Sequence, residues 1–220
     1  MIKLLKKIYR IHKDFWTKSN FYNFLNSTLF FVLAVIIKGY ADNYVDSSTG
    51  TPVGDIILDN IPTLNVDEFV VLGTLIFIII SLILFILKPK FIFFGIKTLA
   101  LFIIIRAFFI SLTHLGVNFH QVILDESTFG YSIYNYLFSS KSDFFFSGHA
   151  GIPFLFALIF YKEKKLRYFL FFCSAFLGII MLLGHLHYSI DVFAAPFMTY
   201  AIYKIAEKLF YKDLKLINLS

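Results

Sequence analysis

Residues 91–112 read FIFFGIKTLALFIIIRAFFISL, an apolar run in which the only charged residues are Lys97 and Arg106. A helix needs about 20 mostly apolar residues to cross the hydrocarbon core of a bilayer. The run meets this length, so we expect it to be a transmembrane helix. An arginine inside such a helix is energetically costly and by default marks a functional site.

The composition excludes an ordinary soluble domain. Hydrophobic residues make up 59% of the 220 residues and charged residues 15%, and phenylalanine occurs 30 times. Soluble proteins average about 25% charged residues. A soluble domain of this size has too little interior to bury so much apolar surface, whereas a bilayer accepts it. The single cysteine, Cys173, cannot form a disulfide within the chain and indicates no redox compartment.

Six apolar runs are candidates for crossing a membrane. They are residues 21–40, 69–87, 91–112, 144–160, 166–186 and 189–210. We therefore predict an all-α, polytopic membrane protein with six transmembrane helices. Residues 21–210 form its membrane domain, between a basic N-terminal segment, 1–20, and a short tail, 211–220. The N-terminal segment lacks the cleavage site of a signal peptide, so we expect the first run to be retained.

The charges that flank these runs predict their orientation. Lysine and arginine gather in segment 1–20, after the second run, between the fourth and fifth runs, and at the C-terminal end. Because short cytoplasmic loops are enriched in these residues, both termini should be cytoplasmic. The two loops on the other side are acidic, with Lys141 as the only strong base of the second. We interpret the basic clusters as topology markers and expect no nucleic-acid partner, despite the net charge of +6.

Two short polar motifs border the apolar runs on the predicted outer side. Ser147-Gly148-His149 lies near the start of the fourth run, and His187-Tyr188-Ser189-Ile190-Asp191 leads into the sixth. The predicted topology places both motifs on the same face of the membrane and at the same depth. We therefore expect them to form one active site on the outer face.

The residue types in these motifs are suited to phosphoryl transfer. His187 and Asp191 are four residues apart and share one face of a helix. The carboxylate can hold one ring nitrogen and leave the other free to attack phosphorus. His149 is placed to protonate a leaving alkoxide. The backbone N–H groups at Ser147 and Gly148 suit a phosphate, because helix N-termini attract anions.

Arg106 should lie beneath the motifs, about 22 Å from the cytoplasmic end of its helix at 1.5 Å per residue. A guanidinium at that depth is a natural partner for a phosphate. Two other interpretations stay open, since Arg106 can also pair with Asp143 or extend its side chain to the interface. A single histidine at a membrane edge is likewise often a packing residue.

A metal site is the main rival to a phosphate site. Several histidines fall near the predicted outer face, namely His114, His120, His149, His185 and His187. Their spacings match no established ligand motif. We therefore predict no metal and no other cofactor.

Together these residues resemble the type 2 phosphatidic acid phosphatase superfamily of membrane lipid phosphatases and phosphotransferases. That superfamily usually carries a Ser-Arg pair shortly before its last histidine, where this chain has Ile180 and Met181. The sphingomyelin synthase branch is more similar to this chain. Its four motifs resemble residues 52–59, 106–113, 143–149 and 185–192, so the resemblance runs from the first apolar run to the sixth.

The resemblance implies a mechanism with three catalytic residues. His187, oriented by Asp191, would attack the head-group phosphorus of a glycerophospholipid, and His149 would protonate the departing diacylglycerol. Ceramide or a similar lipid alcohol would then take the group from the phosphohistidine. The implied substrate-binding residues are Arg106, Asp143, Ser147, Gly148, His185 and Tyr188.

Three functions stay open from the sequence. The first is a sphingomyelin synthase-like phosphotransferase, the second a lipid phosphate phosphatase with water as the acceptor, and the third a catalytically silent lipid-binding protein. The protein should span a plasma membrane or an endomembrane several times, with an exoplasmic, periplasmic or lumenal site. The sequence specifies neither the head group nor the oligomeric state.

Overall fold

The structure, a computed structural model, describes residues 2–138, 140 and 142–218, so Lys141 lies outside the described residues. Its helices are α1 (Ile2–Phe15), α2 (Lys18–Ser47), α3 (Asp67–Leu87), α4 (Ile92–Leu112), α5 (Tyr131–Leu137), α6 (Gly148–Ile159), α7 (Lys164–Leu183), α8 (Ser189–Leu209) and α9 (Tyr211–Asn218). Two short 3₁₀ helices, η1 (Leu58–Asn60) and η2 (Pro89–Phe91), complete the described secondary structure. These residues contain no β-strand, which confirms the all-α prediction.

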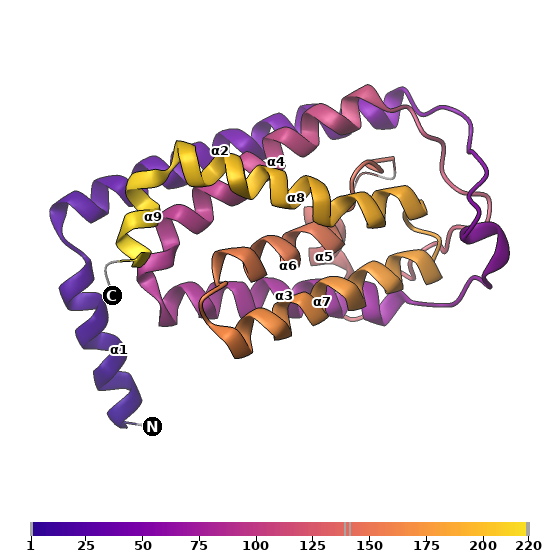
Figure 1. Cartoon of the computed structure of the whole chain (residues 1–220). Helices are drawn as coiled ribbons and strands as arrows, with labels where there is room; N and C mark the ends of the chain where they lie inside the picture. The colour runs from indigo at the N-terminus through magenta and orange to yellow at the C-terminus, as the bar shows by residue number, and fades with distance from the viewer. Residues whose placement is uncertain (1, 139, 141, 219–220) are drawn as a thin grey trace.

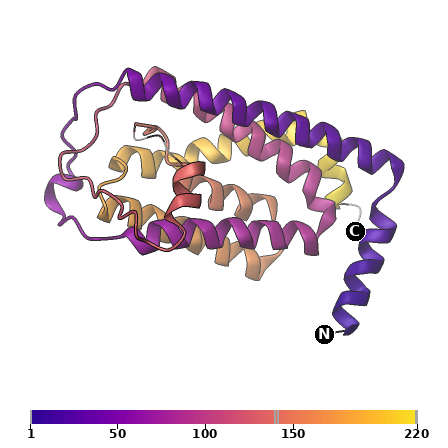
Figure 2. The same cartoon turned by 180° about the vertical axis from the view of Figure 1, so that it is seen from behind.

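Helices α2, α3, α4, α6, α7 and α8 lie alongside one another in an elongated bundle (Figure 1 and Figure 2). Both termini, the α3–α4 turn and the α6–α7 turn lie at one end, which we call the terminal end. The α2–α3 loop, the α4–α6 connection and the α7–α8 turn lie at the other end, which we call the motif end. Both polar motifs are therefore at the motif end of the bundle.

The length and composition of four helices allow them to cross a membrane: α2, α3, α4 together with η2, and α7. The first four residues of the predicted fourth run, 144–147, are not helical, so α6 has only 12 residues. At 1.5 Å per residue it is about 18 Å long, short of a hydrocarbon core of about 30 Å. Helix α8 has 21 residues but carries Lys204, Glu207 and Lys208 near its end.

Helix α2 extends further than the predicted run 21–40. It begins after Thr17, whose hydroxyl accepts a hydrogen bond from Asn20 N, and it continues to Ser47. The added turns at the motif end carry Asp42 and Asp46, and these two residues follow Lys38 at successive intervals of four residues. Residues four apart share a helix face, so α2 presents a polar stripe at this end.

Aromatic side chains form the centre of the bundle. The largest buried cluster contains Phe94, Phe102, Phe146, Phe156 and Phe160, each at most 2% exposed. Phe146 belongs to the segment before α6, and its ring meets that of Phe102 on α4 at 5.3 Å between centroids. The core therefore anchors the segment that leads into the Ser-Gly-His motif.

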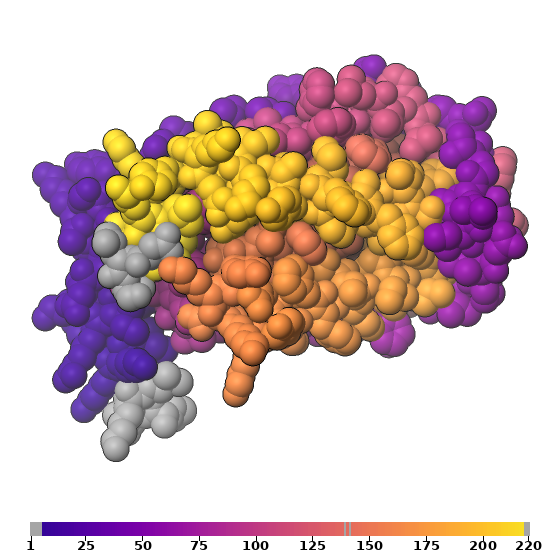
Figure 3. All heavy atoms as spheres, in the orientation of Figure 1, coloured from indigo at the N-terminus to yellow at the C-terminus, as the bar shows by residue number. Residues whose placement is uncertain are grey.

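The outer surface of the bundle is also apolar. Large side chains such as Leu29 on α2, Leu82 on α3 and Phe197 on α8 are exposed. This exposure suits a surface that faces lipid, where apolar side chains cost nothing. Figure 3 shows the face made by α7 and α8, with the segment between α2 and α3 covering the motif end beside them.

A largely buried polar cluster closes the terminal end. Lys97 on α4 donates to Asp213 Oδ2 on α9 at 2.7 Å and to Asn23 Oδ1 on α2 at 2.8 Å. Asn23 Nδ2 donates in turn to Asp213 Oδ1 at 2.6 Å. The cluster joins three helices, and both oxygens of the carboxylate are hydrogen-bonded.

Candidate active site

The histidine and the aspartate of the second motif are in contact. His187 Nδ1 lies 3.3 Å from Asp191 Oδ2, and Tyr188 N donates to the same oxygen at 3.0 Å. A carboxylate only accepts hydrogen bonds, so Nδ1 is the donor, and in the neutral form of the imidazole Nε2 carries the lone pair. The side chains of His187 and Asp191 are 4% and 0% exposed. The imidazole is therefore held in one orientation, with Nε2 available as a nucleophile.

A backbone hydrogen bond connects the two motifs. Ser147 N donates to Asp191 O at 3.0 Å, while the Ser147 hydroxyl accepts from Ala150 N and caps α6. The rings of His149 and His187 lie 6.1 Å apart between centroids. The two histidines, which are 38 positions apart in the chain, thus belong to one site.

The ring of His149 is also positioned by α5. Its Nε2 lies 3.2 Å from the hydroxyl of Tyr134, and the ring of Phe138 is 5.5 Å away between centroids. Burial raises the pKa of Tyr134, with a further contribution from Asp143, so the phenol stays protonated. Tyr134 can therefore donate to His149, a contact that the sequence motifs did not predict.

Arg106 lies against the start of α6. Its Nε donates to Phe146 O at 2.6 Å, its Nη1 to Asp143 Oδ2 at 2.8 Å, and its Nη2 to Asp143 O at 2.5 Å. A Cβ added to Gly148 would lie 3.6 Å from Arg106 Nε, which places the guanidinium directly on that helix end. The pairing with Asp143, one of the alternatives considered for Arg106, is present.

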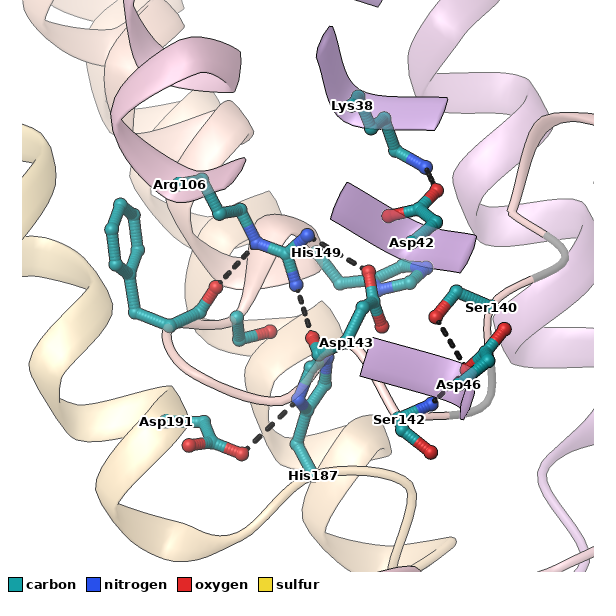
Figure 4. A network of polar contacts seen from close by, with 12 residues as sticks. Lys38, Asp42, Asp46, Arg106, Ser140, Ser142, Asp143, His149, His187 and Asp191 are labelled. Atoms are coloured by element: carbon teal, nitrogen blue, oxygen red, sulfur yellow. Dashed lines mark hydrogen bonds and ion pairs between the residues drawn. The ribbon is translucent and has the colours of Figure 1, made fainter. Parts of the chain in front are cut away.

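The Asp143 carboxylate is the anion held by Arg106 in this structure (Figure 4). Burial alone would raise the pKa of Asp143, but the charge and hydrogen bond of Arg106, together with His187 and Lys38, outweigh burial and hold the pKa below its ordinary value. Asp143 is therefore ionised at neutral pH. It occupies Arg106 hydrogen-bond donors that a phosphate would need.

Helix α2 contributes further charged groups to the site. Lys38 donates to Asp42 Oδ2, and this pair lies beside Arg106, Asp143 and His149 (Figure 4). The other oxygen of Asp42 is buried and has no hydrogen-bond partner among the described residues. The i,i+4 spacing of Lys38 and Asp42 was a signal in the sequence. The predicted run 21–40 ends before Asp42, so the prediction did not place the two residues on one helix.

The segment before α6 is held in place by the end of α2. Asp46 Oδ1 accepts hydrogen bonds from Ser140 Oγ at 3.0 Å and from Ser142 N at 3.1 Å. The hydroxyls of Thr49 and Ser142 are 2.7 Å apart. These contacts fix the chain immediately before Asp143.

The first loop positions the start of α8. Asp55 Oδ2 accepts from Ser189 N at 2.6 Å, and its Oδ1 accepts from Ile57 N and Leu58 N. The hydroxyl of Tyr188 donates to Gly116 O at 2.8 Å and accepts from Val53 N at 3.2 Å. The structure therefore uses Tyr188, a predicted substrate-binding residue, to hold the loops at the motif end.

His185 lies in a separate hollow. Its Nδ1 is 3.5 Å from the Thr63 hydroxyl, and its Nε2 is buried without a partner among the described residues. The hollow has a volume of about 360 Å³ and is also lined by Asp59 and His120. The structure does not bring His185 into contact with the ring of His149 or His187.

The predicted catalytic residues and several of the predicted substrate-binding residues come together. His149, His187 and Asp191 meet Ser147 and Gly148, with Arg106 and Asp143 beside them. Such an arrangement can supply a nucleophile, a second imidazole for proton transfer and a guanidinium for an anion. In the described part of the chain, no three His, Cys, Asp or Glu side chains are grouped to hold a metal ion.

Comparison with protein families identifies the part of the chain that carries this site. Residues 142–208 match the family model described as PAP2 superfamily C-terminal. The matched stretch contains both histidine motifs and supports membership of the PAP2 superfamily, although it does not single out the sphingomyelin synthase branch. No curated protein and no solved structure matches the chain.

Proposed function

We propose that this protein is a lipid phosphotransferase that moves a phosphorylated head group from a glycerophospholipid to ceramide or a similar lipid alcohol. The PAP2 match suggests lipid phosphatase or phosphotransferase activity, and the apolar helices suggest an integral membrane protein. The sphingomyelin synthase-like motifs support the choice of transfer. Both termini would be cytoplasmic and the motif end would lie at the outer face.

The single observation that carries the proposal is the pair of histidines. Their ring centroids are 6.1 Å apart, one ring is held by a buried carboxylate, and a guanidinium lies beside the pair. Two imidazoles at this separation can act on opposite bonds of one phosphorus atom. Separate packing roles for His149 and His187 would not explain this convergence.

In the first half-reaction, the lipid phosphate replaces the Asp143 carboxylate at Arg106. His187 Nε2 then forms a bond to phosphorus while the bond from phosphorus to the glycerol oxygen breaks. His149 is neutral while it accepts the hydrogen bond from Tyr134, so it must first take up a proton. In this protonated form it gives the proton to the departing oxygen, which leaves as diacylglycerol. The head-group phosphate stays on His187, whose Nδ1–H is stabilised by Asp191.

In the second half-reaction, neutral His149 takes the proton of the acceptor hydroxyl. The acceptor oxygen bonds to phosphorus, and the bond between phosphorus and His187 breaks. The product is the phosphorylated acceptor, and both histidines return to their initial protonation states.

The decisive experiment uses purified protein in lipid nanodiscs with a fluorescent ceramide and either phosphatidylcholine or phosphatidylethanolamine. Lipid chromatography should show a new phosphorylated sphingolipid and diacylglycerol. His187→Gln should abolish both products. His114→Gln is the matched control, because the ring of His114 packs on Tyr44 outside the histidine pair, and it should retain activity.

The products also separate this proposal from its alternatives. Steady release of phosphate or of phosphorylated head group, without a sphingolipid product, would assign the site to a phosphatase. No turnover of any phospholipid or lipid phosphate would overturn the enzymatic proposal. An alkaline quench should preserve the phosphohistidine, and mass spectrometry should locate it on His187.

A further inference from the structure

A groove runs along the bundle between α6, α7 and α8. Its volume is about 530 Å³. Among the described residues that line it, Ser174 is the only one with a polar side chain, and its hydroxyl donates to Ala150 O at 2.7 Å. The groove therefore offers no free side-chain polar group and suits only an apolar occupant.

One face of α7 forms the floor of this groove. The lining positions 171, 174, 175, 178 and 182 recur at intervals of one, three or four residues, which places them on one helical stripe. Small residues at its centre, Ser174, Ala175 and Gly178, leave the space open. A Cβ added to Gly178 would approach Val192 Cγ1 to 3.0 Å, so even a methyl group there would make a tight contact with the α8 side of the groove.

The groove passes beside the histidine site. Ala150 and Val192 both line it, and they directly follow His149 and Asp191 in the chain. Ala150 also belongs to the first turn of α6, and Val192 to the first turn of α8. A molecule in the groove therefore passes next to the residues proposed for the chemistry.

The groove extends from the level of the histidine site toward the terminal end. Ala150 and Val192 approach α7 at Gly178, and from Gly178 to Phe171 the groove follows α7 over seven residues, or about 10 Å. The hydrocarbon core of a membrane is about 30 Å thick, so one leaflet contributes about 15 Å. The groove would therefore hold about two thirds of an acyl chain that spans one leaflet and is anchored by a phosphate at the histidines.

We propose that this groove between α6, α7 and α8 binds one acyl chain of the donor phospholipid and fixes the depth of its phosphate at His187. The inference rests on the proposed function, because that function places the phosphate between the two histidines. The other acyl chain stays in the surrounding bilayer. The site thus selects donors by chain as well as by head group.

Ala175→Phe tests the proposal by filling the groove. Ala175 lines the groove and is exposed, so the larger side chain does not disturb the packed core. We expect kcat/KM for long-chain donors to fall about tenfold or more, since a filled pocket discriminates strongly between chains. Turnover of a short-chain donor should be unchanged. Ala201→Phe, at an exposed position of α8 outside the groove, is the matched control and should behave like the wild type.

A second readout does not depend on turnover. A phospholipid with a photoactivatable acyl chain should label peptides from α7 in the wild type and in inactive His187→Gln, and Ala175→Phe should lose the label. Equal loss of long-chain and short-chain turnover, or labelling that Ala175→Phe leaves intact, would overturn the groove proposal. Crosslinks at α7 between two copies of the protein would also overturn it, because they would show that a helix of the second copy covers the groove. Labelling of α7 without any turnover would instead retain the groove and overturn the proposed function.

Discussion

Two buried polar clusters lie at opposite ends of the same bundle, and they differ in how completely they are hydrogen-bonded. At the terminal end, Asn23, Lys97 and Asp213 satisfy one another, and both oxygens of Asp213 are used. At the motif end, Asp191 Oδ1 and Asp42 Oδ1 are buried without a partner among the described residues.

The difference separates a cluster that stabilises the fold from a cluster that is suited to binding a substrate. A buried polar atom without a partner costs about 1–3 kcal/mol, so a cluster that serves only the fold should leave none. The terminal cluster meets that expectation and joins α2, α4 and α9. The motif-end cluster keeps unpaired atoms in the region where a substrate would arrive. Two aspartates, Asp191 and Asp213, therefore make a direct test of the contrast.

The largest effect is expected for Asp191→Asn. An amide keeps the size of the side chain but no longer enforces the Nδ1–H tautomer of His187. We expect kcat to fall by about 10³-fold or more, as when the orienting carboxylate of a catalytic triad is replaced. The unfolding midpoint in detergent should stay close to that of the wild type. A change in the pH profile of kcat would show that Asp191 acts through His187, whereas unchanged kcat would remove Asp191 from the mechanism.

The opposite result is expected for Asp213→Asn. Its loss leaves Lys97 without a counter-charge in a buried position, which should lower the free energy of unfolding by about 3 kcal/mol. Denaturant unfolding in detergent measures this change. The kcat of the protein that remains folded should equal that of the wild type. A variant that is fully stable but slow would contradict the separation of the two ends.

A smaller effect on binding is expected for Asp143→Asn. The change removes the carboxylate that pairs with Arg106 but preserves its backbone contacts. A partly exposed ion pair is worth about 1 kcal/mol, so an anion should bind about fivefold more tightly once this competitor is gone. Inhibition by vanadate, a phosphate analogue, measures this affinity. Weaker inhibition would mean that Asp143 helps to build the anion site rather than occupying it.

The smallest effect is expected at acidic pH through Asp55. Burial alone would raise the pKa of Asp55, but hydrogen bonds from Ser189 N, Leu58 N and Ile57 N outweigh burial and lower it. A lowered pKa means that the carboxylate stabilises the fold above its unfolded pKa of 3.8. This stabilisation is lost as the pH falls through the still lower folded value. Between about pH 6 and about pH 3, the melting temperature of Asp55→Asn should fall less than that of the wild type. An equal fall in melting temperature in the two proteins would rule out this contribution of Asp55.

The helical architecture followed from the apolar runs, but several boundaries did not. Runs of apolar residues indicate which segments avoid water, and this property sets the all-α class. They do not indicate where the backbone leaves the helix, so the start of α6 was placed four residues too early. The Ser147 cap, together with the hydrogen bond from Arg106 to Phe146 O, ends the irregular segment there.

The candidate site was predictable only where its residues are close together in the sequence or are linked by the predicted topology. Spacing within one motif placed His187 and Asp191 together, and topology placed His149 near them. Contacts between distant segments carry no such local signal. Tyr134 beside His149 and Asp55 at the start of α8 therefore emerged only from the structure.

The hydrogen bond from Ser147 N to Asp191 O has a consequence for the design of variants. It couples the two histidine motifs through space, while the chain that links them in sequence makes its turn at the far end of the bundle, at Tyr161 and Lys162. Both residues are exposed, and exposed turns accept inserted domains well. A fluorescent or soluble reporter domain inserted between them should leave the geometry of the histidines intact. The same turn is therefore a natural place to attach a probe to a working enzyme.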